Sequence, residues 1–505
     1  MSQRNPNPAH LNPAHLNLAQ FCLQRQAQAT PDKVALIVVT DVAAQAERWT
    51  YAQIERAVRS VGAGLLALGL QPRDRIILRL PDSSDYALLF FGAIAAGLVP
   101  VPVSAQLTGA EAAFLATDTE AALIVGATVP GANGMSLGTD EVARLGQAAP
   151  MPFYADTAAE DPAYMIYTSG TGSRPKGVVH AHRVVLGRAP MRRDWQAIGP
   201  DDVMLHAGAF NWSYTLGVGL LDPWAAGATA VLYAGPRDVT IWPAVIRATG
   251  ATLFAAVPSL YRQILKYGTL ERADFAQLRH CLAAGEALSP AIRDGWVAAT
   301  GCPLFEALGM SECSTFVSGG PGVPVRPGSA GKPQTGRLVA VLPVDGGTDP
   351  LPAGQTGLLA IHRHEPGLML GYWRRPDEDA ATRRGDWFIG GDLAEFDADG
   401  YLWHRGRADD VMTPGGYRVS PAEVEAAFAD CPGVAELAVK EVQVRPDVSL
   451  IAAYAVRAAG STISEAEILH HGEQRLAAYK RPKQVHFVDA LPRSANGKLL
   501  RRVLG

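Results

Sequence analysis

The sequence lacks the features of several protein classes. It has five cysteines among 505 residues, at positions 22, 281, 302, 313 and 431, and no Cys-x-x-Cys pair. This pattern argues against a disulfide framework or a zinc knuckle and favours a reducing, cytoplasmic compartment. The formal net charge is −4, so no excess of positive charge favours nucleic acid as a partner. A small anion can still bind in a local basic cleft.

Long hydrophobic runs are also lacking. Residues 1–17 contain the tandem NPAHL-NPAHL and no apolar segment of the kind found in signal peptides, which predicts a disordered lead-in. Residues 86–103, YALLFFGAIAAGLVPVPV, approach the length of a membrane span, but Gly97, Pro100 and Pro102 interrupt them. We expect a buried helix followed by a buried strand there, and no membrane span.

Short apolar runs alternate with helical patterns over most of the chain. Examples of the apolar runs are VALIVV (34–39), RIILRL (75–80), AALIVG (121–126), ATAVLYA (228–234) and ATLFAAV (251–257). This alternation predicts an α/β fold, with a large N-terminal domain of mostly parallel sheets flanked by helices. Residues 328–399 are rich in Gly and Pro between short strand patterns and predict a β-rich subdomain.

The pattern changes again near GRADD, residues 406–410. The helical segments PAEVEAAFAD and SEAEILHHGEQRLAAY then alternate with the strand-like VAELAVKEV, LIAAYAV and QVHFVD. We therefore predict a domain at 18–408 and a small α+β domain at 409–505, which is long enough to fold by itself.

One short stretch, YTSGTGSRPKG at 167–177, carries the chemistry of a phosphate-binding loop. Glycines let backbone N–H groups point inward, hydroxyls add donors, and cations neutralise charge. The Walker A pattern GxxxxGK[ST] fails here, because Pro175 stands at the second glycine and Gly177 at the Ser/Thr. An ordinary surface loop is the alternative.

Several later motifs, taken with this loop, resemble those of the adenylate-forming superfamily of acyl-CoA synthetases, peptide-synthetase adenylation domains and beetle luciferases. In order they are AAGEALSP (283–290), LFEALGMSE (304–312), WFIGGD (387–392), GRADD (406–410), GGYR (415–418) and LPRSANGKLLRR (491–502). Within the superfamily the sequence looks most like benzoate-type and medium-chain acyl-CoA ligases. Each of these residues, taken alone, also fits an ordinary structural role. The motifs occur together and in the same order as in the superfamily, which favours the resemblance.

The resemblance implies a site for ATP and Mg²⁺. Catalytic roles would fall to Lys498, Glu312 and Thr168, with Glu312 also reaching the metal. The phosphate-binding residues would be Thr168, Ser169, Gly170, Thr171, Gly172, Ser173 and Lys176. The adenine and ribose contacts would be Gly285, Glu286, Ala287, Ala307, Leu308, Gly309, Ser311, Asp392 and Arg407. Leu308 stands where many members have an aromatic residue that stacks on adenine, so strong stacking is not expected.

The same resemblance implies two half-reactions. A carboxylate attacks the α-phosphate of ATP to give an acyl-adenylate and pyrophosphate, and a thiol then displaces AMP. Coenzyme A would bind at Gly415, Gly416, Tyr417 and Arg418. Lys498 and Gly416 lie in the same small domain and cannot serve one site in one pose, so a mobile C-terminal domain rotating about Asp409 is implied.

The substrate acid is less well indicated. Residues 206–224, HAGAFNWSYTLGVGLLDPW, would form part of the acyl pocket, through His206, Phe210, Asn211, Trp212, Tyr214 and Gly217. Packing in the core is an equal alternative for Phe210, Trp212 and His206. We expect an aromatic or medium-chain acid, with free coenzyme A as acceptor. A stand-alone adenylation enzyme that loads a carrier protein is the alternative, and a homodimer is left open.

Overall fold

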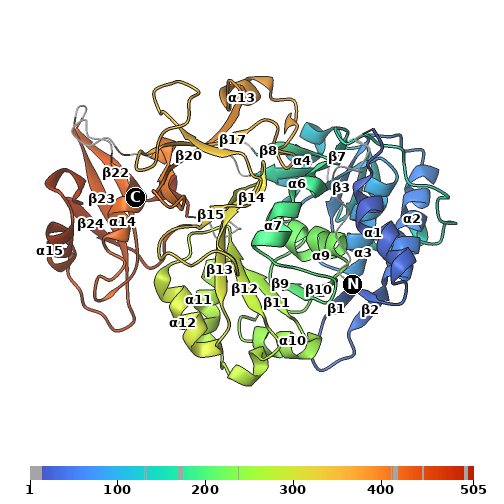
Figure 1. Ribbon diagram of the computed structural model, residues 1–505, viewed down its shortest axis with the longest axis horizontal. Helices are drawn as coiled ribbons and strands as arrows, with labels where there is room; N and C mark the ends of the chain where they lie inside the picture. Colours follow the sequence, from blue (N-terminus) through green and yellow to red (C-terminus); the bar gives the residue numbers. More distant parts are fainter. Residues whose placement is uncertain are drawn as a thin grey trace. The chain divides into compact units, whose positions relative to one another are not determined.

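The computed structural model describes residues 14–505 except 130, 132, 133, 169–174, 237, 411, 413–418, 446, 447 and 494–498. The chain forms two compact units (Figure 1). The first consists of residues 1–338 and 363–381, and the second of residues 339–362 and 382–505.

The first unit is built around a nine-stranded sheet with the order β15-β14-β13-β12-β11-β9-β10-β1-β2. Its strands are β1 (Val34–Val39), β2 (Glu47–Thr50), β9 (Val203–His206), β10 (Thr229–Tyr233), β11 (Leu253–Ala256), β12 (His280–Ala284), β13 (Leu304–Met310), β14 (Ser314–Ser318) and β15 (Lys332–Pro333). The six strands from β13 to β1 are parallel, and the outer strands are antiparallel. The apolar runs VALIVV, ATAVLYA and ATLFAAV supply β1, β10 and β11, because central parallel strands are buried on both faces.

Alternate side chains of this sheet enter two different cores. Leu205, Phe254 and Cys281 pack with Trp296 in a core that also contains residues of three helices. These helices are α10 (Trp242–Thr249), α11 (Pro258–Tyr267) and α12 (Pro290–Thr300). On the other face, Met204 and Ala255 pack against α7 (Ala189–Asp194) and the π-helix η2 (Gly217–Leu221). The candidate acyl segment therefore lies against the second face.

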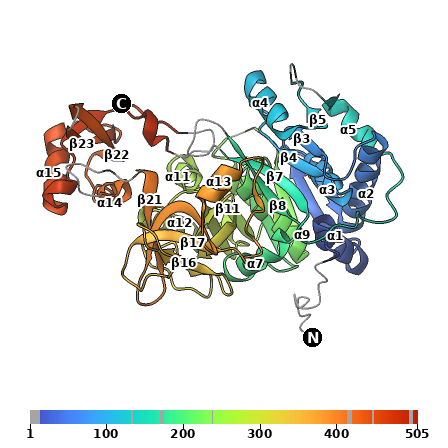
Figure 2. The ribbon, with the colours of Figure 1, turned by 90° about the horizontal axis from the view of Figure 1, so that it is seen from above.

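A second sheet of the same unit has the order β4-β3-β5-β6 and is entirely parallel. It consists of β3 (Arg75–Arg79), β4 (Val99–Pro102), β5 (Leu123–Gly126) and β6 (Met135–Leu137). One face packs on α2 (Tyr51–Ala67), α3 (Ser84–Ala95) and α5 (Thr139–Leu145) (Figure 2). The other face packs on α4 (Gly109–Thr119) and on the hairpin of β7 (Pro162–Thr168) and β8 (Lys176–Ala181). The hairpin whose two strands flank the predicted phosphate loop therefore packs on this sheet.

The apolar stretch at 86–103 forms most of α3 and all of β4, as predicted. Helix α3 has 12 residues and begins at the N-cap Ser83, whose hydroxyl accepts the N–H of Tyr86. Among the described residues, no helix is both long and apolar enough to cross a membrane.

The ordered chain begins earlier than predicted. Leu16 and Asn17, placed by sequence in the disordered lead-in, are buried. The side chain of Asn17 caps α1 (Leu18–Ala29) and donates to the carbonyl of Ile94, and the N–H of Leu18 donates to His182 Nδ1. These polar partners and the burial of Leu16 outweigh the Asn/Pro-rich composition.

The second unit contains two sheets. The β-rich subdomain predicted at 328–399 supplies β16 (Val339–Leu342), β17 (Gly357–His362), β19 (Arg383–Arg384) and β20 (Trp387–Phe396), and β21 (Leu402–Arg407), just beyond the predicted range, pairs with β20. The C-terminal α+β part has β22 (Val434–Arg445), β23 (Val448–Arg457) and β24 (Gln484–Phe487), with α14 (Pro421–Ala426) and α15 (Glu465–Arg475). The fold class is thus confirmed, while the predicted domain boundary at Asp409 stays a prediction.

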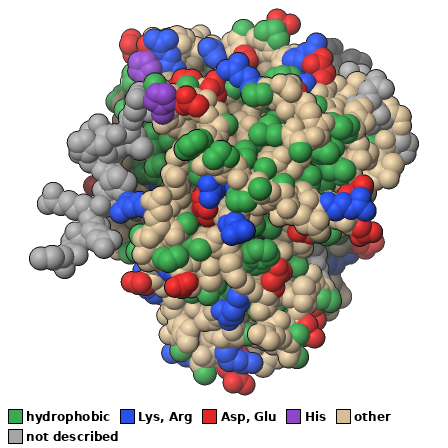
Figure 3. Space-filling view, turned by 90° about the vertical axis from the view of Figure 1, so that its right-hand side faces the viewer, with side chains coloured by type: hydrophobic (Ala, Val, Ile, Leu, Met, Phe, Trp, Pro, Cys, Tyr) green, Lys and Arg blue, Asp and Glu red, His purple; other side chains and the backbone are tan. Residues whose placement is uncertain are grey.

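The remaining helices are short. They are α6 (Val184–Gly187), α8 (Ser213–Leu216), α9 (Asp222–Ala226), η3 (Arg272–Phe275), α13 (Pro376–Ala381), η4 (Ala408–Asp410), η6 (Ala478–Lys480) and η7 (Arg501–Val503). Basic and acidic side chains are interspersed among the described residues on the face shown in Figure 3. That distribution agrees with the small net charge.

The chain leaves the first unit after residue 338 and returns to it at residue 363. A buried ion pair joins these two points: Arg337 Nη1 donates to Glu365 Oε1 over 2.5 Å, and the two side chains are 1% and 3% exposed. Arg337 Nη2 also donates to the carbonyl of Thr315. This pair fixes the place where the return segment, residues 363–381, begins.

We expect Glu365→Gln to destabilise the protein by about 3–5 kcal/mol, because it leaves the Arg337 charge buried without its counter-ion. Urea unfolding followed by tryptophan fluorescence measures the loss. The matched control is Glu120→Gln, which breaks the pair with Arg374, where the two side chains are 54% and 57% exposed. The control should cost less than about 1 kcal/mol. Equal effects of the two variants would contradict this role of the buried pair.

Four buried histidines belong to the first unit: His180, His182, His206 and His280. Burial lowers the pKa of His180, His182 and His280 to about 4 and that of His206 to about 3. The folded state therefore holds these imidazoles neutral, whereas the unfolded chain protonates them near pH 6.5.

Stability should fall as the pH drops from about 6.5 towards 4, because the unfolded state binds more protons in that range, and should not depend on these histidines above about pH 7. His280, near Arg279 and Asp202, donates from Nε2 to the carbonyl of Gln196. His280→Gln should reduce the pH dependence by about 3 kcal/mol over this window. Urea midpoints at several pH values measure it, and His15→Gln, at an exposed site, is the control. An unchanged slope in His280→Gln would contradict the assignment.

Candidate active site

The β7–β8 hairpin holds both ends of the predicted phosphate loop. Thr168 ends β7 and pairs with Lys176 at the start of β8. The predicted loop residues Ser169, Gly170, Thr171, Gly172 and Ser173 lie outside the described residues. The structure therefore fixes where the loop begins and ends.

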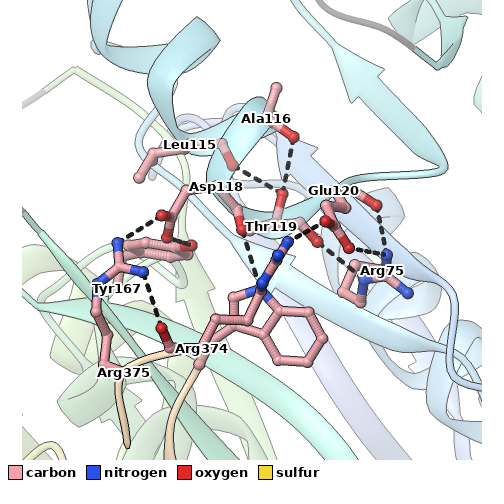
Figure 4. Close-up of polar contacts among 10 residues, drawn as sticks. Arg75, Leu115, Ala116, Asp118, Thr119, Glu120, Tyr167, Arg374 and Arg375 are labelled. Atoms are coloured by element: carbon pink, nitrogen blue, oxygen red, sulfur yellow. Dashed lines mark hydrogen bonds and ion pairs between the residues drawn. The ribbon is translucent and has the colours of Figure 1, made fainter. Parts of the chain in front are cut away.

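The first end of the loop is anchored to helix α4 (Figure 4). Tyr167 donates its hydroxyl to Asp118 Oδ2 over 2.6 Å, and Arg375 Nη2 donates to Oδ1 of the same carboxylate over 2.6 Å. Trp373 Nε1 donates to the backbone carbonyl of Asp118. Burial and the Asp118 carboxylate raise the pKa of Tyr167, so its hydroxyl stays a donor.

A second contact of the return segment lies beside this one (Figure 4). Arg374 pairs with Glu120, and Arg75 donates to the carbonyls of Thr119 and Glu120. The Arg75 guanidinium lies 5.3 Å from the centre of the Trp373 ring. Residues 373–375 are thereby fixed on the C-terminal end of α4.

The second end of the loop meets the candidate metal acid through one tyrosine. Lys176 forms an ion pair with Glu378 and lies 5.1 Å from the centre of the Tyr372 ring. Tyr372 donates its hydroxyl to Glu312 Oε1 over 2.8 Å. The structure thus brings together Lys176 and Glu312, which the sequence assigned to phosphate and metal, and adds Tyr372 and Glu378 between them.

The backbone next to Glu312 is held from β8. His180 Nε2 lies 2.9 Å from the carbonyl oxygen of Ser311, which can only accept, so Nε2 carries the proton. The His180 ring stacks on Tyr164 with centres 4.8 Å apart. Cys313 is buried, and burial raises the pKa of its thiol to about 12, so it stays protonated. A packing role accounts for Cys313.

Glu312 has the chemistry to take part in a magnesium site. One carboxylate oxygen accepts from Tyr372, and no described residue donates to Oε2. Magnesium binds hard oxygens and commonly takes one or two protein carboxylates, completing its shell with water and phosphate. The residues therefore fit a metal that arrives with a nucleotide.

The candidate adenine residues lie on two neighbouring strands. Gly285 follows β12 with a φ of +90°, and Ala307, Leu308 and Gly309 belong to the adjacent parallel strand β13. The Glu286 carboxylate accepts from the N–H and hydroxyl of Ser259 at the start of α11. Its side chain therefore has a helix-capping role, whereas Gly285 and Ala287 present backbone.

Two further candidates lie in the second unit, at the β20–β21 pairing. Asp392 is opposite Arg407, and His404 Nε2 lies 3.0 Å from Asp392 Oδ1. Arg407 Nη1 donates to the carbonyl of Gly390, and its Nη2 would lie 2.8 Å from a Cβ on Gly391. Gly391 also has a φ of +85°, so glycine is required there. Asp392 is thus fixed by His404, which the sequence did not single out.

Some of the candidate acyl residues are buried and others are partly exposed. Phe210 is 1% exposed and packs with Tyr86 in the core, which is the structural alternative left open for it. Asn211, Trp212 and Tyr214 are partly exposed. His206 is buried against Tyr214, with ring centres 4.3 Å apart, and Gly217 faces the Arg188 guanidinium.

The remaining predicted residues belong to the coenzyme A and C-terminal motifs. The described residues do not include the coenzyme A candidates Gly415, Gly416, Tyr417 and Arg418 or the candidate catalytic residue Lys498. For Asp409 the structure describes the backbone, which belongs to η4. Tyr372, Glu378 and His180 were missed by sequence reasoning. Tyr372 lies in the stretch GLMLGYW, residues 367–373, outside the motifs that the sequence assigned to ATP.

Two family models match the chain. The AMP-binding enzyme model matches residues 23–373, and the model of the AMP-binding enzyme C-terminal domain matches residues 423–498. The loop at 167–177 and the motifs at 283–290 and 304–312 lie in the first matched range, Lys498 ends the second, and the motifs at 387–392, 406–410 and 415–418 lie between the two ranges. The two matches confirm the resemblance inferred from sequence.

Two relatives that are similar over most of the chain are aryl-CoA ligases. The chain is 30% identical over 476 residues to the 3-hydroxybenzoate–CoA ligase of Aromatoleum sp. (strain CIB), with 89% of this chain and 90% of the relative covered. It is 32% identical over 477 residues to the benzoate–CoA ligase of Thauera aromatica, with 90% of each chain covered.

A solved structure shows the same fold. It is the anthranilate CoA ligase AuaEII in complex with anthranoyl-AMP, with a TM-score of 0.87, 28% identity and 98% of each chain covered. With the two models covering most of the chain and relatives at 30% identity or more, the protein belongs to the family of AMP-binding enzymes.

Proposed function

We propose that this chain is an ATP-dependent, AMP-forming carboxylate–CoA ligase that acts on an aromatic or medium-chain carboxylic acid. The observation that carries the proposal is the link from Lys176 through Tyr372 to Glu312 beside the phosphate loop. Lys176 and Glu312, the candidates for phosphate and metal, belong to one cluster, which supports the proposal. The aryl-CoA ligases among the relatives support the reaction class.

The first half-reaction activates the acid. A carboxylate is a poor electrophile, because its charge repels nucleophiles and oxide is a poor leaving group. One carboxylate oxygen forms a bond to the α-phosphorus of ATP, the bond from that phosphorus to the bridging oxygen breaks, and pyrophosphate leaves. The products are acyl-AMP and pyrophosphate.

The residues of this chain supply positioning and charge. Thr168, Lys176 and the loop between them hold the β- and γ-phosphates through backbone N–H groups, hydroxyls and the lysine charge. Glu312, with Ser311 beside it, would hold the magnesium ion, which would neutralise phosphate charge. Lys176 must leave Glu378 for a phosphate, so ATP competes with an internal ion pair.

The second half-reaction transfers the acyl group. The thiolate sulfur of coenzyme A attacks the acyl carbonyl, a C–S bond forms, and AMP leaves with its oxygen. Lys498 serves the first step by stabilising charge between the carboxylate and the α-phosphate. Gly415–Arg418 serve the second, and a rotation about Asp409 exchanges the two. Asp392 and Arg407 hold the ribose.

The acceptor, the location and the oligomeric state complete the proposal. A carrier protein is the alternative acceptor to free coenzyme A. The five cysteines are unpaired thiols, which supports a reducing, cytoplasmic location. The proposal holds for a monomer and for a homodimer alike.

The first test is the release of AMP and pyrophosphate with MgATP and coenzyme A across aromatic, alicyclic and C4–C12 acids. Lys498→Ala should lower the adenylation rate by at least about 10²-fold, because it removes a charge that acts in the transition state. Lys483→Ala, at an exposed lysine of the same unit, should retain the rate. ADP as product would refute the proposal, and pyrophosphate exchange without a thioester would favour the carrier-protein alternative.

A second test concerns Tyr372. Tyr372→Phe removes the hydroxyl that orients Glu312, and loss of such a partner typically weakens metal binding by about 10–100-fold. We expect the Mg²⁺ concentration for half-maximal adenylation to rise, with the KM of the acid unchanged. Tyr267→Phe, at a side chain that is 57% exposed, is the control. An unchanged Mg²⁺ dependence would separate Tyr372 from the metal site.

A further inference from the structure

Two buried polar atoms beside the acyl segment have no hydrogen-bond partner among the described residues. They are Nε2 of His206, at the end of β9, and Oγ1 of Thr215, in α8. The residues are 2% and 0% exposed. A buried donor or hydroxyl without a partner costs about 1–3 kcal/mol, so its presence calls for an explanation.

The protonation of His206 follows from its other nitrogen. The N–H of Gly208 donates to His206 Nδ1 over 3.0 Å, so Nδ1 is unprotonated and the neutral ring carries its proton on Nε2. The Tyr214 ring stands at 80° to the imidazole with centres 4.3 Å apart. An N–H contact to an aromatic face is weak and does not replace an oxygen acceptor. His206 therefore offers a hydrogen-bond donor.

Thr215 differs from the other buried helical threonines. Thr119, Thr249 and Thr300 each donate their hydroxyl to the carbonyl four residues earlier. Helix α8 begins at Ser213, so the carbonyl four residues before Thr215 precedes the helix. The Thr215 hydroxyl has no such bond and is left to donate and to accept.

The two side chains are close neighbours. A Cβ on Gly208 would collide with Thr215 Oγ1 and would lie 3.2 Å from Cε1 and 3.3 Å from Nδ1 of His206, so the Thr215 hydroxyl lies beside the imidazole ring. A Cβ on Gly219 would lie 2.9 Å from His206 Cβ and 3.6 Å from Thr215 Cγ2. Gly219 belongs to the π-helix η2, and such segments occur frequently at functional sites.

The guanidinium near this segment is already occupied. Arg188 also faces this helix, at Gly217. Its Nε and Nη2, however, donate to the two oxygens of the buried Asp222, and its Nη1 donates to Ser314 Oγ. All three nitrogens of Arg188 are thus engaged, so it is not available to a second carboxylate of the substrate. A hydroxyl is complementary to the pair, because it accepts from His206 and donates to Thr215.

Building on the proposed function, we infer that His206 and Thr215 read a hydroxyl group on the substrate, so that the acid is a hydroxy-substituted aromatic carboxylic acid. Sites built to hydrogen-bond a substrate hydroxyl reject the analogue without it by up to about 10⁴–10⁵-fold. The preference arises because benzoate leaves the two buried groups without partners.

The test compares 3- and 4-hydroxybenzoate with benzoate and the corresponding fluoro- and methylbenzoates, as kcat/KM for AMP formation. The wild type should prefer one hydroxy acid over benzoate by at least about tenfold, and Thr215→Val should reduce this ratio by about tenfold or more. Thr249→Val, at a buried threonine whose hydroxyl is bonded, is the control and should leave the ratio unchanged. His206→Phe should act like Thr215→Val.

A preference for benzoate in the wild type, or an equal loss for both acids in Thr215→Val, would overturn the inference while leaving the ligase function intact. The second result would indicate a structural role or a trapped water. An independent readout is the ¹⁵N–¹H signal of the His206 ring, assigned with His206→Phe. It should shift when the preferred hydroxy acid is added and not when benzoate is added. A shift without AMP formation from any acid would support the site and refute the proposed function, whereas no shift would overturn the inference.

Discussion

The return of the chain into the first unit is the constraint on which the candidate site depends. Residues 363–381 come back after an excursion into the other unit, and the buried Arg337–Glu365 pair sets where they begin. From that point Tyr372 reaches Glu312, Glu378 reaches Lys176, and Arg375 reaches Asp118. A single segment thus orders the candidate metal acid and both ends of the phosphate loop. A shift of this segment would disturb all three together.

Each cation of this cluster has an acidic partner within the protein. Lys176 is paired with Glu378, and the Asp118 carboxylate is shared by Tyr167 and Arg375. A cation without a partner would attract any anion. A cation that is already paired with a carboxylate binds a ligand only if the ligand displaces that carboxylate, which favours a ligand with more negative charge. A polyphosphate with its metal meets that requirement better than a single phosphate does, since it offers several anionic oxygens at once. Selectivity for a nucleotide triphosphate is consistent with this arrangement.

The sequence predicted the fold class and the residues of the ATP motifs, because both leave local signals. Apolar runs mark buried parallel strands, and Thr168, Lys176 and Glu312 stand in short ordered motifs. The partners were not predictable, because they are distant in sequence. Tyr372 is 60 residues from Glu312, His180 is 131 residues from Ser311, and Arg375 is 257 residues from Asp118. A tyrosine, a histidine and an arginine outside motifs have no local pattern that distinguishes such roles from ordinary surface or core positions.

The acyl segment shows why burial alone does not decide between packing and binding. Phe210 and His206 are both almost fully buried, and sequence gave them equal alternatives. Phe210 needs nothing beyond the apolar contacts it makes with Tyr86 and the surrounding core. His206 and Thr215, in contrast, place hydrogen-bonding atoms where the described chain provides no partner, while Arg188 nearby is fully engaged by Asp222. An imbalance of this kind has a stability cost, so the group that removes it is best sought in the substrate rather than in the protein.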